Sequence, residues 1–194
     1  MNEIKERPIL FSAPMVRAIL EGRKTVTRRM CKPQPSANAH TTCASGNPMG
    51  AWWETGKDIN RCPHGQPGDR LWVREAWVEI NVAQAPGESW VVYRECDNCT
   101  DYGGPWKPSI HMRRRNSRIL LEITAVRVER LQDISRADIR AEGLQCPPEL
   151  ASDDVSPNYR DWYPVAWREL WESTGGDWNA NPWVWVVEFK RVTP

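Results

Sequence analysis

A short segment near the amino terminus concentrates side chains that can do chemistry. The segment 22–29 reads GRKTVTRR and carries one amine, two hydroxyl groups and three guanidinium groups. Alternate residues of a strand share a face, so we expect Thr25, Thr27 and Arg29 to point one way and Val26 to point into the core. The segment therefore predicts a polar site at a turn between a helix and a strand.

A second basic segment lies in the middle of the chain. The sequence HMRRRNSR places Arg113, Arg114, Arg115 and Arg118 within a few residues of His111. Guanidinium groups bind phosphates through paired hydrogen bonds, so this cluster predicts a local nucleic-acid contact. A solvated loop or strand end is the alternative, because the net charge of +1 does not indicate a polyanion partner. The histidine is either structural or an acid or base beside a phosphate.

The six cysteines allow two interpretations. Cys96 and Cys99 have the two-residue gap of a zinc knuckle, and Cys62 with His64 could supply the other half of a tetrahedral site. The usual second Cys-x-x-Cys is missing, so free thiols are favoured and we predict neither a metal nor a cofactor. The charged first residues and the lack of a long apolar run predict a cytoplasmic protein with no membrane contact.

Hydrophobic periodicity indicates which elements must position these residues. Alternation and β-branched residues predict strands at 8–11, 24–29, 69–80, 90–93, 117–131 and 183–192. Helical spacing predicts helices at 15–21, 136–142 and 161–173. Many strands with few, short helices predict an α+β fold, a small mixed β-barrel with helices packed at its ends. We expect a single domain over 1–194, with an irregular insertion at about 31–66.

Four residues resemble the signature of a known family. Gly22, Lys24, Thr27 and Arg29 match the Gly-x-Lys-x-x-Thr-x-Arg pattern of ASCH domains. Three further segments support this resemblance, namely GDRLWVRE at 68–75, LQDISRADIRAEGL at 131–144 and WVWVVEFKRV at 183–192. The wider pattern is similar to the larger phage and prophage ASCH proteins. The resemblance implies a PUA-like barrel.

The resemblance also implies a chemistry. ASCH domains are regarded as RNA-binding, and minimal members include amidohydrolases that deacetylate N4-acetylcytidine with a lysine, a threonine and a glutamate. Those positions fall here on Lys24, Thr27 and Glu142. A lysine with a lowered pKa can activate the threonine hydroxyl, and a protonated glutamate can donate to the departing amine. We expect Arg23 and its neighbours Arg28 and Arg29 to lower the pKa of the lysine.

The expected partner is RNA or a modified nucleoside, and no protein partner is evident. Arg29, Arg74 and the basic segment around His111 are predicted to bind this ligand. A reader of RNA without catalysis is the alternative to the amidohydrolase. A ribonuclease, in which His111 or Lys24 activates a 2'-hydroxyl group, is the third hypothesis.

Overall fold

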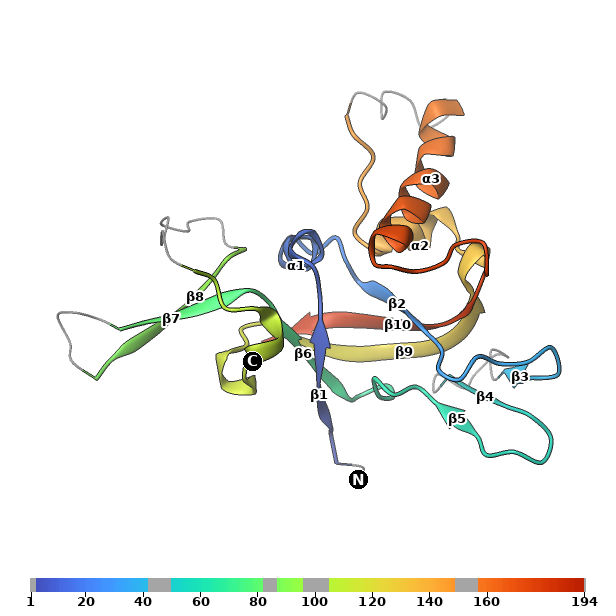
Figure 1. The fold of residues 1–194 in the computed structure, drawn as a ribbon, viewed down its shortest axis with the longest axis horizontal. Coiled ribbons are helices and arrows are strands. Elements are labelled where there is room, and N and C mark those ends of the chain that lie inside the picture. Colours follow the sequence, from blue (N-terminus) through green and yellow to red (C-terminus); the bar gives the residue numbers. More distant parts are fainter. Residues whose placement is uncertain (1–2, 42–49, 82–86, 96–104, 149–156, 194) are drawn as a thin grey trace.

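A mixed five-stranded sheet forms the centre of the computed structural model, which describes residues 3–41, 50–81, 87–95, 105–148 and 157–193. Its strands are β1 (Glu6–Leu10), β2 (Val26–Met30), β6 (Arg70–Arg74), β9 (Leu120–Arg130) and β10 (Trp183–Val192). Their order is β1-β6-β9-β10-β2, and β1 pairs with β6 in parallel while the other pairs are antiparallel (Figure 1). The predicted α+β class is confirmed. Among the described residues, strand pairing leaves β1 and β2 as edges and does not close a barrel.

The two edge strands are joined by α1 (Ala13–Leu20). Pro14 lies in its first turn, and Gly22, at φ +76°, takes the left-handed conformation that turns the chain toward β2. Across the gap between the two edges, Nη2 of Arg29 donates a hydrogen bond to the carbonyl oxygen of Leu10 at 2.6 Å. The helix and this bond therefore keep the two edges close.

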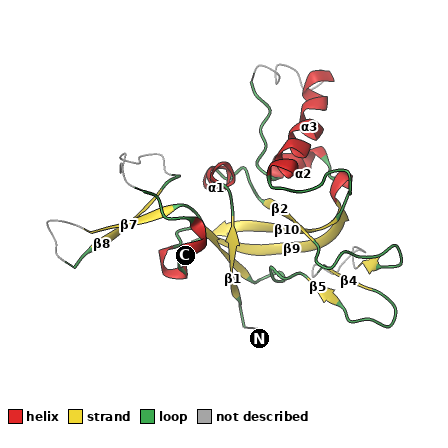
Figure 2. Cartoon of the chain, in the orientation of Figure 1, coloured by secondary structure: helices red, strands yellow, loops and turns green. Residues whose placement is uncertain are grey.

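Strand β10 is buried on both faces and divides the hydrophobic core in two. Trp185, Val187 and Phe189 belong to a large cluster with residues of β1, β6, β9 and α1. Val184 and Val186 belong to a second cluster with the helices α2 (Arg136–Ala141) and α3 (Pro157–Ser173). Figure 2 shows these two helices together beside β2, away from the hairpin of β7 and β8. The β2 edge therefore lies where the sheet meets the helical layer.

Smaller elements extend from both ends of this sheet. Three short strands, β3 (His40–Thr41), β4 (Ala51–Trp53) and β5 (Asn60–Arg61), pair antiparallel within the segment 31–66. The hairpin contains β7 (Trp77–Asn81) and β8 (Ser89–Tyr93). Three 3-10 turns, η1 (Ser109–His111), η2 (Arg114–Asn116) and η3 (Leu131–Asp133), complete the described elements.

The sequence patterns locate most elements to within a few residues. The hydroxyl oxygen of Ser135 accepts a bond from the backbone N–H of Asp138 at 3.1 Å, and α2 begins at residue 136, where the predicted helix begins. The predicted strand 69–80 is instead two strands, β6 and β7, and between them the buried carboxylate of Glu75 accepts hydrogen bonds from the guanidinium group of Arg118 at 2.8 and 3.0 Å. Helix α3 begins at Pro157, earlier than predicted. None of the described helices is long and apolar enough to cross a membrane.

Candidate functional site

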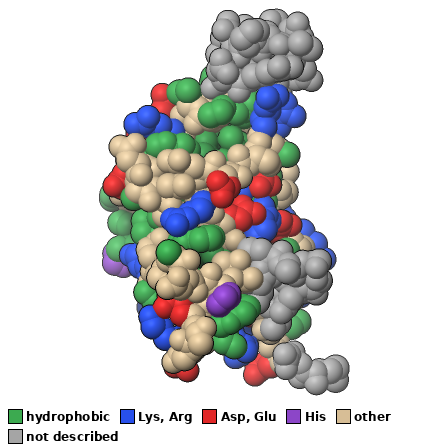
Figure 3. Space-filling view, turned by 90° about the vertical axis from the view of Figure 1, so that its right-hand side faces the viewer, with side chains coloured by type: hydrophobic (Ala, Val, Ile, Leu, Met, Phe, Trp, Pro, Cys, Tyr) green, Lys and Arg blue, Asp and Glu red, His purple; other side chains and the backbone are tan. Residues whose placement is uncertain are grey.

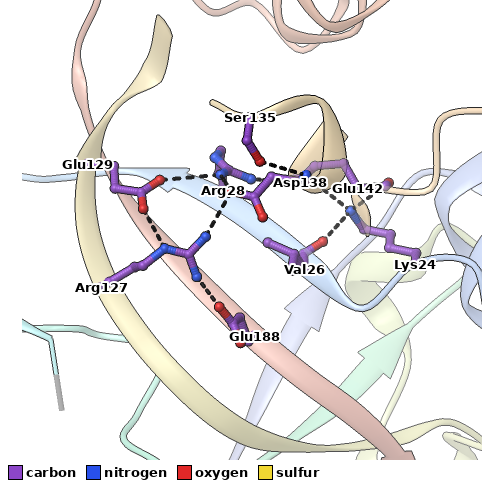
Figure 4. Close-up of polar contacts among 9 residues, drawn as sticks. All are labelled: Lys24, Val26, Arg28, Arg127, Glu129, Ser135, Asp138, Glu142 and Glu188. Carbon is purple, nitrogen blue, oxygen red and sulfur yellow. Dashed lines mark hydrogen bonds and ion pairs between the residues drawn. The ribbon is translucent and has the colours of Figure 1, made fainter. Parts of the chain in front are cut away.

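A buried ion pair between Lys24 and Glu142 forms the centre of the site. Nζ of Lys24 donates to Oε2 of Glu142 at 2.6 Å, to the carbonyl oxygen of Glu142 at 3.0 Å and to that of Val26 at 2.7 Å (Figure 4). An ammonium group has three donors, so these bonds use all of them. Both side chains are almost fully buried. The pair is therefore held in one geometry.

The backbone brings these two residues together although they are 118 residues apart in the sequence. Lys24 and Glu142 form an isolated antiparallel bridge, and the N–H of Thr25 donates to the carbonyl oxygen of Ala141 at 2.8 Å. Gly143 follows at φ +94°, where a Cβ would lie 2.8 Å from that of Ala18 and 3.1 Å from that of Lys24. Only glycine fits this position without movement of its neighbours.

Arg28 links the ion pair to a wider set of charges. Its Nη1 contacts Glu142 at 3.2 Å, and its Nη2 contacts Asp138 at 2.8 Å and Glu129 at 3.3 Å. Arg127 binds Asp138 at 2.9 Å and also pairs with Glu129 and Glu188. We call these residues the ion network, and its members are Lys24, Arg28, Arg127, Glu129, Asp138, Glu142 and Glu188. Every cation in the network therefore has at least one carboxylate partner.

Burial is the main cause of the lowered pKa of Lys24. The pKa of Lys24 is lowered chiefly because the group is desolvated, with smaller contributions from the charges of Arg29 and Arg28. Glu142 opposes this and raises the pKa. Arg23, which was expected to act with the other arginines, instead bonds to Glu21 and to the carbonyl oxygen of Gly143.

Arg29 occupies the opposite face of β2 from Arg28. Burial lowers its pKa, and its guanidinium group lies 5.3 Å from the centre of the Phe11 ring. Burial also lowers the pKa of His64 to about 4, and the charges of Arg29 and Arg7 lower it further. The imidazole group is therefore neutral at pH 7.

A cavity of about 440 Å³ opens at the β2 edge, between that strand and α3. Its lining includes Thr27, Arg28, Arg29, Glu142, Trp167 and Trp171. Within the described part of the chain, four buried donors from these residues lack an acceptor, namely Nε of Arg28 and Arg29 and Nε1 of both tryptophans. Buried donors normally have partners, so the cavity is suited to a ligand rich in hydrogen-bond acceptors.

The structure brings part of the predicted site together at this cavity. Thr27, Arg29 and Glu142 line it. Lys24 is not among the lining residues but is hydrogen-bonded to Glu142. Arg74 lies elsewhere, with its guanidinium group 4.7 Å from the centre of the Trp72 ring.

The basic segment divides into two environments. His111, Arg113 and Arg115 line a separate cavity of about 280 Å³. Arg114 instead pairs with Glu6, with Nε 2.5 Å from Oε2. Of the two alternative bases of the ribonuclease hypothesis, His111 lines this cavity with the two arginines and Lys24 does not.

Sequence reasoning did not identify the two tryptophans that line the cavity, or the ion network. Trp167 and Trp171 lie in the predicted helix 161–173, and their rings pack in the second hydrophobic cluster. Their indole N–H groups, however, have no acceptor among the described residues. Asp138 lies in the predicted helix 136–142, and its carboxylate binds Arg28 and Arg127. No spacing rule marks such long-range charge pairs.

The zinc hypothesis falls largely on residues outside the described ranges, because both Cys96 and Cys99 lie there. Cys62 and Cys31 are buried, and burial raises their pKa values to about 11 and about 12. Among the residues that the structure describes, no three His, Cys, Asp or Glu side chains lie close enough to hold a metal ion.

The sequence matches no known protein-family profile and no curated protein. Two solved structures resemble the chain. An ASCH domain from Lactobacillus crispatus has 15% identity, and the match covers 98% of this chain and 81% of that one with a TM-score of 0.41. A protein of Enterococcus faecalis assigned to DUF984 has 10% identity, with 100% and 84% coverage and a TM-score of 0.42. An ASCH domain is thus among the structures that this chain resembles, as the sequence motifs predicted, and neither likeness bears on ligand or activity.

Proposed function

We propose that the cavity at the β2 edge binds a nucleoside or an RNA base, and that Lys24, Thr27 and Glu142 remove an acyl group from N4-acylated cytosine. The observation that carries this proposal is the buried Lys24–Glu142 pair beside a cavity lined by Thr27. As part of the same proposal, the fold is PUA-like and the protein binds RNA.

The cavity lining supports a base as the ligand. Two indole groups offer apolar contact, and their N–H groups, with Nε of Arg28 and Arg29, are free to donate. An acylated cytosine presents carbonyl oxygens and a ring nitrogen as acceptors, so its pattern is complementary to these donors. The carboxylate of Glu142 adds a group that can exchange a proton with the exocyclic amine.

The ion pair supports a two-step hydrolysis. A proton shift from Nζ of Lys24 to Oε2 of Glu142, across 2.6 Å, gives a neutral amine beside a carboxylic acid. The amine takes the proton of Thr27 as Oγ attacks the acyl carbon, and Glu142 protonates the departing nitrogen. An acyl-threonine and free cytosine result, with the ion pair restored.

The second step reverses these proton transfers. Glu142 takes a proton from water, the resulting hydroxide attacks the acyl carbon, and Lys24 returns its proton to Oγ of Thr27 as the carboxylic acid leaves. Burial of Lys24 favours this cycle, because desolvation lowers the pKa of the ammonium group and makes the neutral amine accessible.

The test is conversion of N4-acetylcytidine to cytidine by the purified protein, followed chromatographically. Thr27→Ala is expected to lower kcat by at least about 100-fold, since it removes the nucleophile. Thr25→Ala is the matched control, because this threonine is two residues away and exposed. No conversion by the parent protein, or equal rates in both variants, would contradict the amidohydrolase proposal.

A reader of RNA without catalysis is the second candidate, and the unpaired donors of the cavity favour it. Quenching of tryptophan fluorescence by cytidine tests this binding separately from turnover. Trp167→Phe is expected to remove part of the signal and one donor. Binding without turnover would identify a reader, and the absence of both would refute the cavity as a nucleoside site.

A further inference from the structure

A second cavity shares no lining residue with the first. Among the described residues, its cations form no ion pair and two of its buried donors have no acceptor. Its volume is about 280 Å³, and it lies between the start of β7 and the segment 107–116. Trp77 and Lys107 hold these two parts together through backbone bonds of 2.9 and 3.3 Å.

The cations of this cavity lack carboxylate partners. Within the described part of the chain, the side chains of Lys107, Arg113 and Arg115 form no ion pair, and the single lining carboxylate, Glu79, accepts a bond from Ser89 at 2.9 Å. Arg114, between the two arginines, is paired with Glu6 instead. Three permanent cations therefore face one carboxylate, and the local field is positive.

Two buried side-chain donors at the same cavity have no acceptor among the residues that the structure describes. They are Nδ2 of Asn116, which is 6% exposed, and Nε1 of Trp77, which is 5% exposed. At these atoms, the amide group and the indole group can donate hydrogen bonds but cannot accept them. Buried donors are seldom left unpaired, so their presence beside a cationic cavity indicates a ligand made of acceptor oxygens.

We propose that this cavity binds a phosphate group, carried by RNA or by a small phosphorylated molecule. A phosphate offers negatively charged oxygens to Arg113, Arg115 and Lys107, and can accept from Nδ2 of Asn116 as well. His111, exposed at the rim, adds a further donor. This proposal depends on the proposed function in one respect, because the proposed RNA binding is the reason for using RNA as a probe.

The decisive experiment compares three arginines in one short segment. Binding of a fluorescein-labelled single-stranded oligoribonucleotide is measured by anisotropy, and binding of inorganic phosphate by calorimetry. Arg113→Gln and Arg115→Gln are each expected to weaken binding about tenfold. Arg114→Gln removes the same charge from a residue outside the lining, and is expected to leave affinity nearly unchanged.

The salt dependence gives an independent readout. Loss of one phosphate contact to single-stranded RNA should make the slope of log K against log salt shallower by about 0.7. This change is expected for Arg113→Gln and Arg115→Gln and not for Arg114→Gln. Weakened binding of both probes would support a site open to free phosphate, and weakened binding of RNA alone would support a site for polynucleotide phosphate.

Equal loss in all three variants would overturn the proposal, because it would indicate general attraction to positive charge. Unchanged binding in Arg113→Gln and Arg115→Gln would overturn it too. Thr27→Ala separates the two proposals, because it should abolish turnover of N4-acetylcytidine and retain the parent's affinity for inorganic phosphate. Thermal unfolding of each variant confirms that the fold is intact.

Discussion

The ion network and the cavity proposed to bind phosphate use the same residue types in opposite ways. We call the latter, lined by Lys107, Arg113 and Arg115, the phosphate cavity. In the network, Arg28 and Arg127 are each bound by two or more carboxylates, and Arg28 is fully buried. In the phosphate cavity, Arg113 and Arg115 are exposed and have no carboxylate partner among the described residues. Figure 3 shows a face on which acidic and basic side chains lie next to one another near the middle. The number of arginines in a region thus says little about ligand binding. Whether each arginine has a carboxylate partner distinguishes structural cations from those available to a ligand.

The largest expected effect comes from removing one charge of the network. Glu142→Gln leaves Lys24 without its carboxylate, and we expect the free energy of unfolding to fall by about 3–5 kcal/mol in urea titration. Glu79→Gln, at the phosphate cavity, is the control and should change stability by less than about 0.5 kcal/mol. In the double variant Lys24→Met, Glu142→Leu, most of the loss should be recovered. Additive losses would show that the pair is not coupled.

A smaller effect is expected from the glycine that positions the pair. Gly143→Ala should lower the free energy of unfolding by about 2–4 kcal/mol, because the added Cβ meets Ala18 and adopts a left-handed backbone. Gly22→Ala has a similar φ with open space around it, so its cost should be about 1 kcal/mol. Equal losses in urea titration would mean that the contact with Ala18 contributes nothing.

The exposed part of the network should matter less. Arg127→Gln is expected to cost about 1–2 kcal/mol, because this guanidinium group is only partly buried although it binds three carboxylates. Arg115→Gln should leave the melting temperature within about 1 °C of the parent value. The contrast between the network and the phosphate cavity would fail if both substitutions destabilised the protein equally.

The smallest effect concerns pH. The pKa of His64 is lowered from 6.5 to about 4, so the unfolded chain binds a proton between these values and the folded chain does not. The free energy of unfolding should therefore fall as the pH drops from 6.5 toward 4. In His64→Gln this fall should be smaller, by about 0.8 kcal/mol at pH 6, with almost no difference at pH 7.5. Parallel pH profiles of the parent and the variant would contradict the assignment.

Local patterns predicted local features well. The alternation at 183–192 and the helical spacing at 136–142 each correspond to an observed element, and the Gly22 turn lies where the helix ends. These features depend on residues close in the chain, which periodicity and capping rules describe.

Features that join distant segments could not be predicted in this way. Arg28 was interpreted only as a cation near Lys24, yet it is 101 residues from Glu129 and 110 from Asp138 in sequence. The split of the basic segment into paired and unpaired arginines depends on Glu6, 108 residues from Arg114. Only the tertiary fold determines which charges meet.

The double burial of β10 has a consequence for how the molecule opens. Because Trp185 packs in one cluster and Val186 in the other, the strand is shared by both halves of the core. Neither cluster can separate from β10 without exposing apolar surface of the other, so the two should unfold as one cooperative unit. Amide hydrogens of β10 should then exchange as slowly as global unfolding allows, and the cavity at the β2 edge should persist until the whole molecule unfolds.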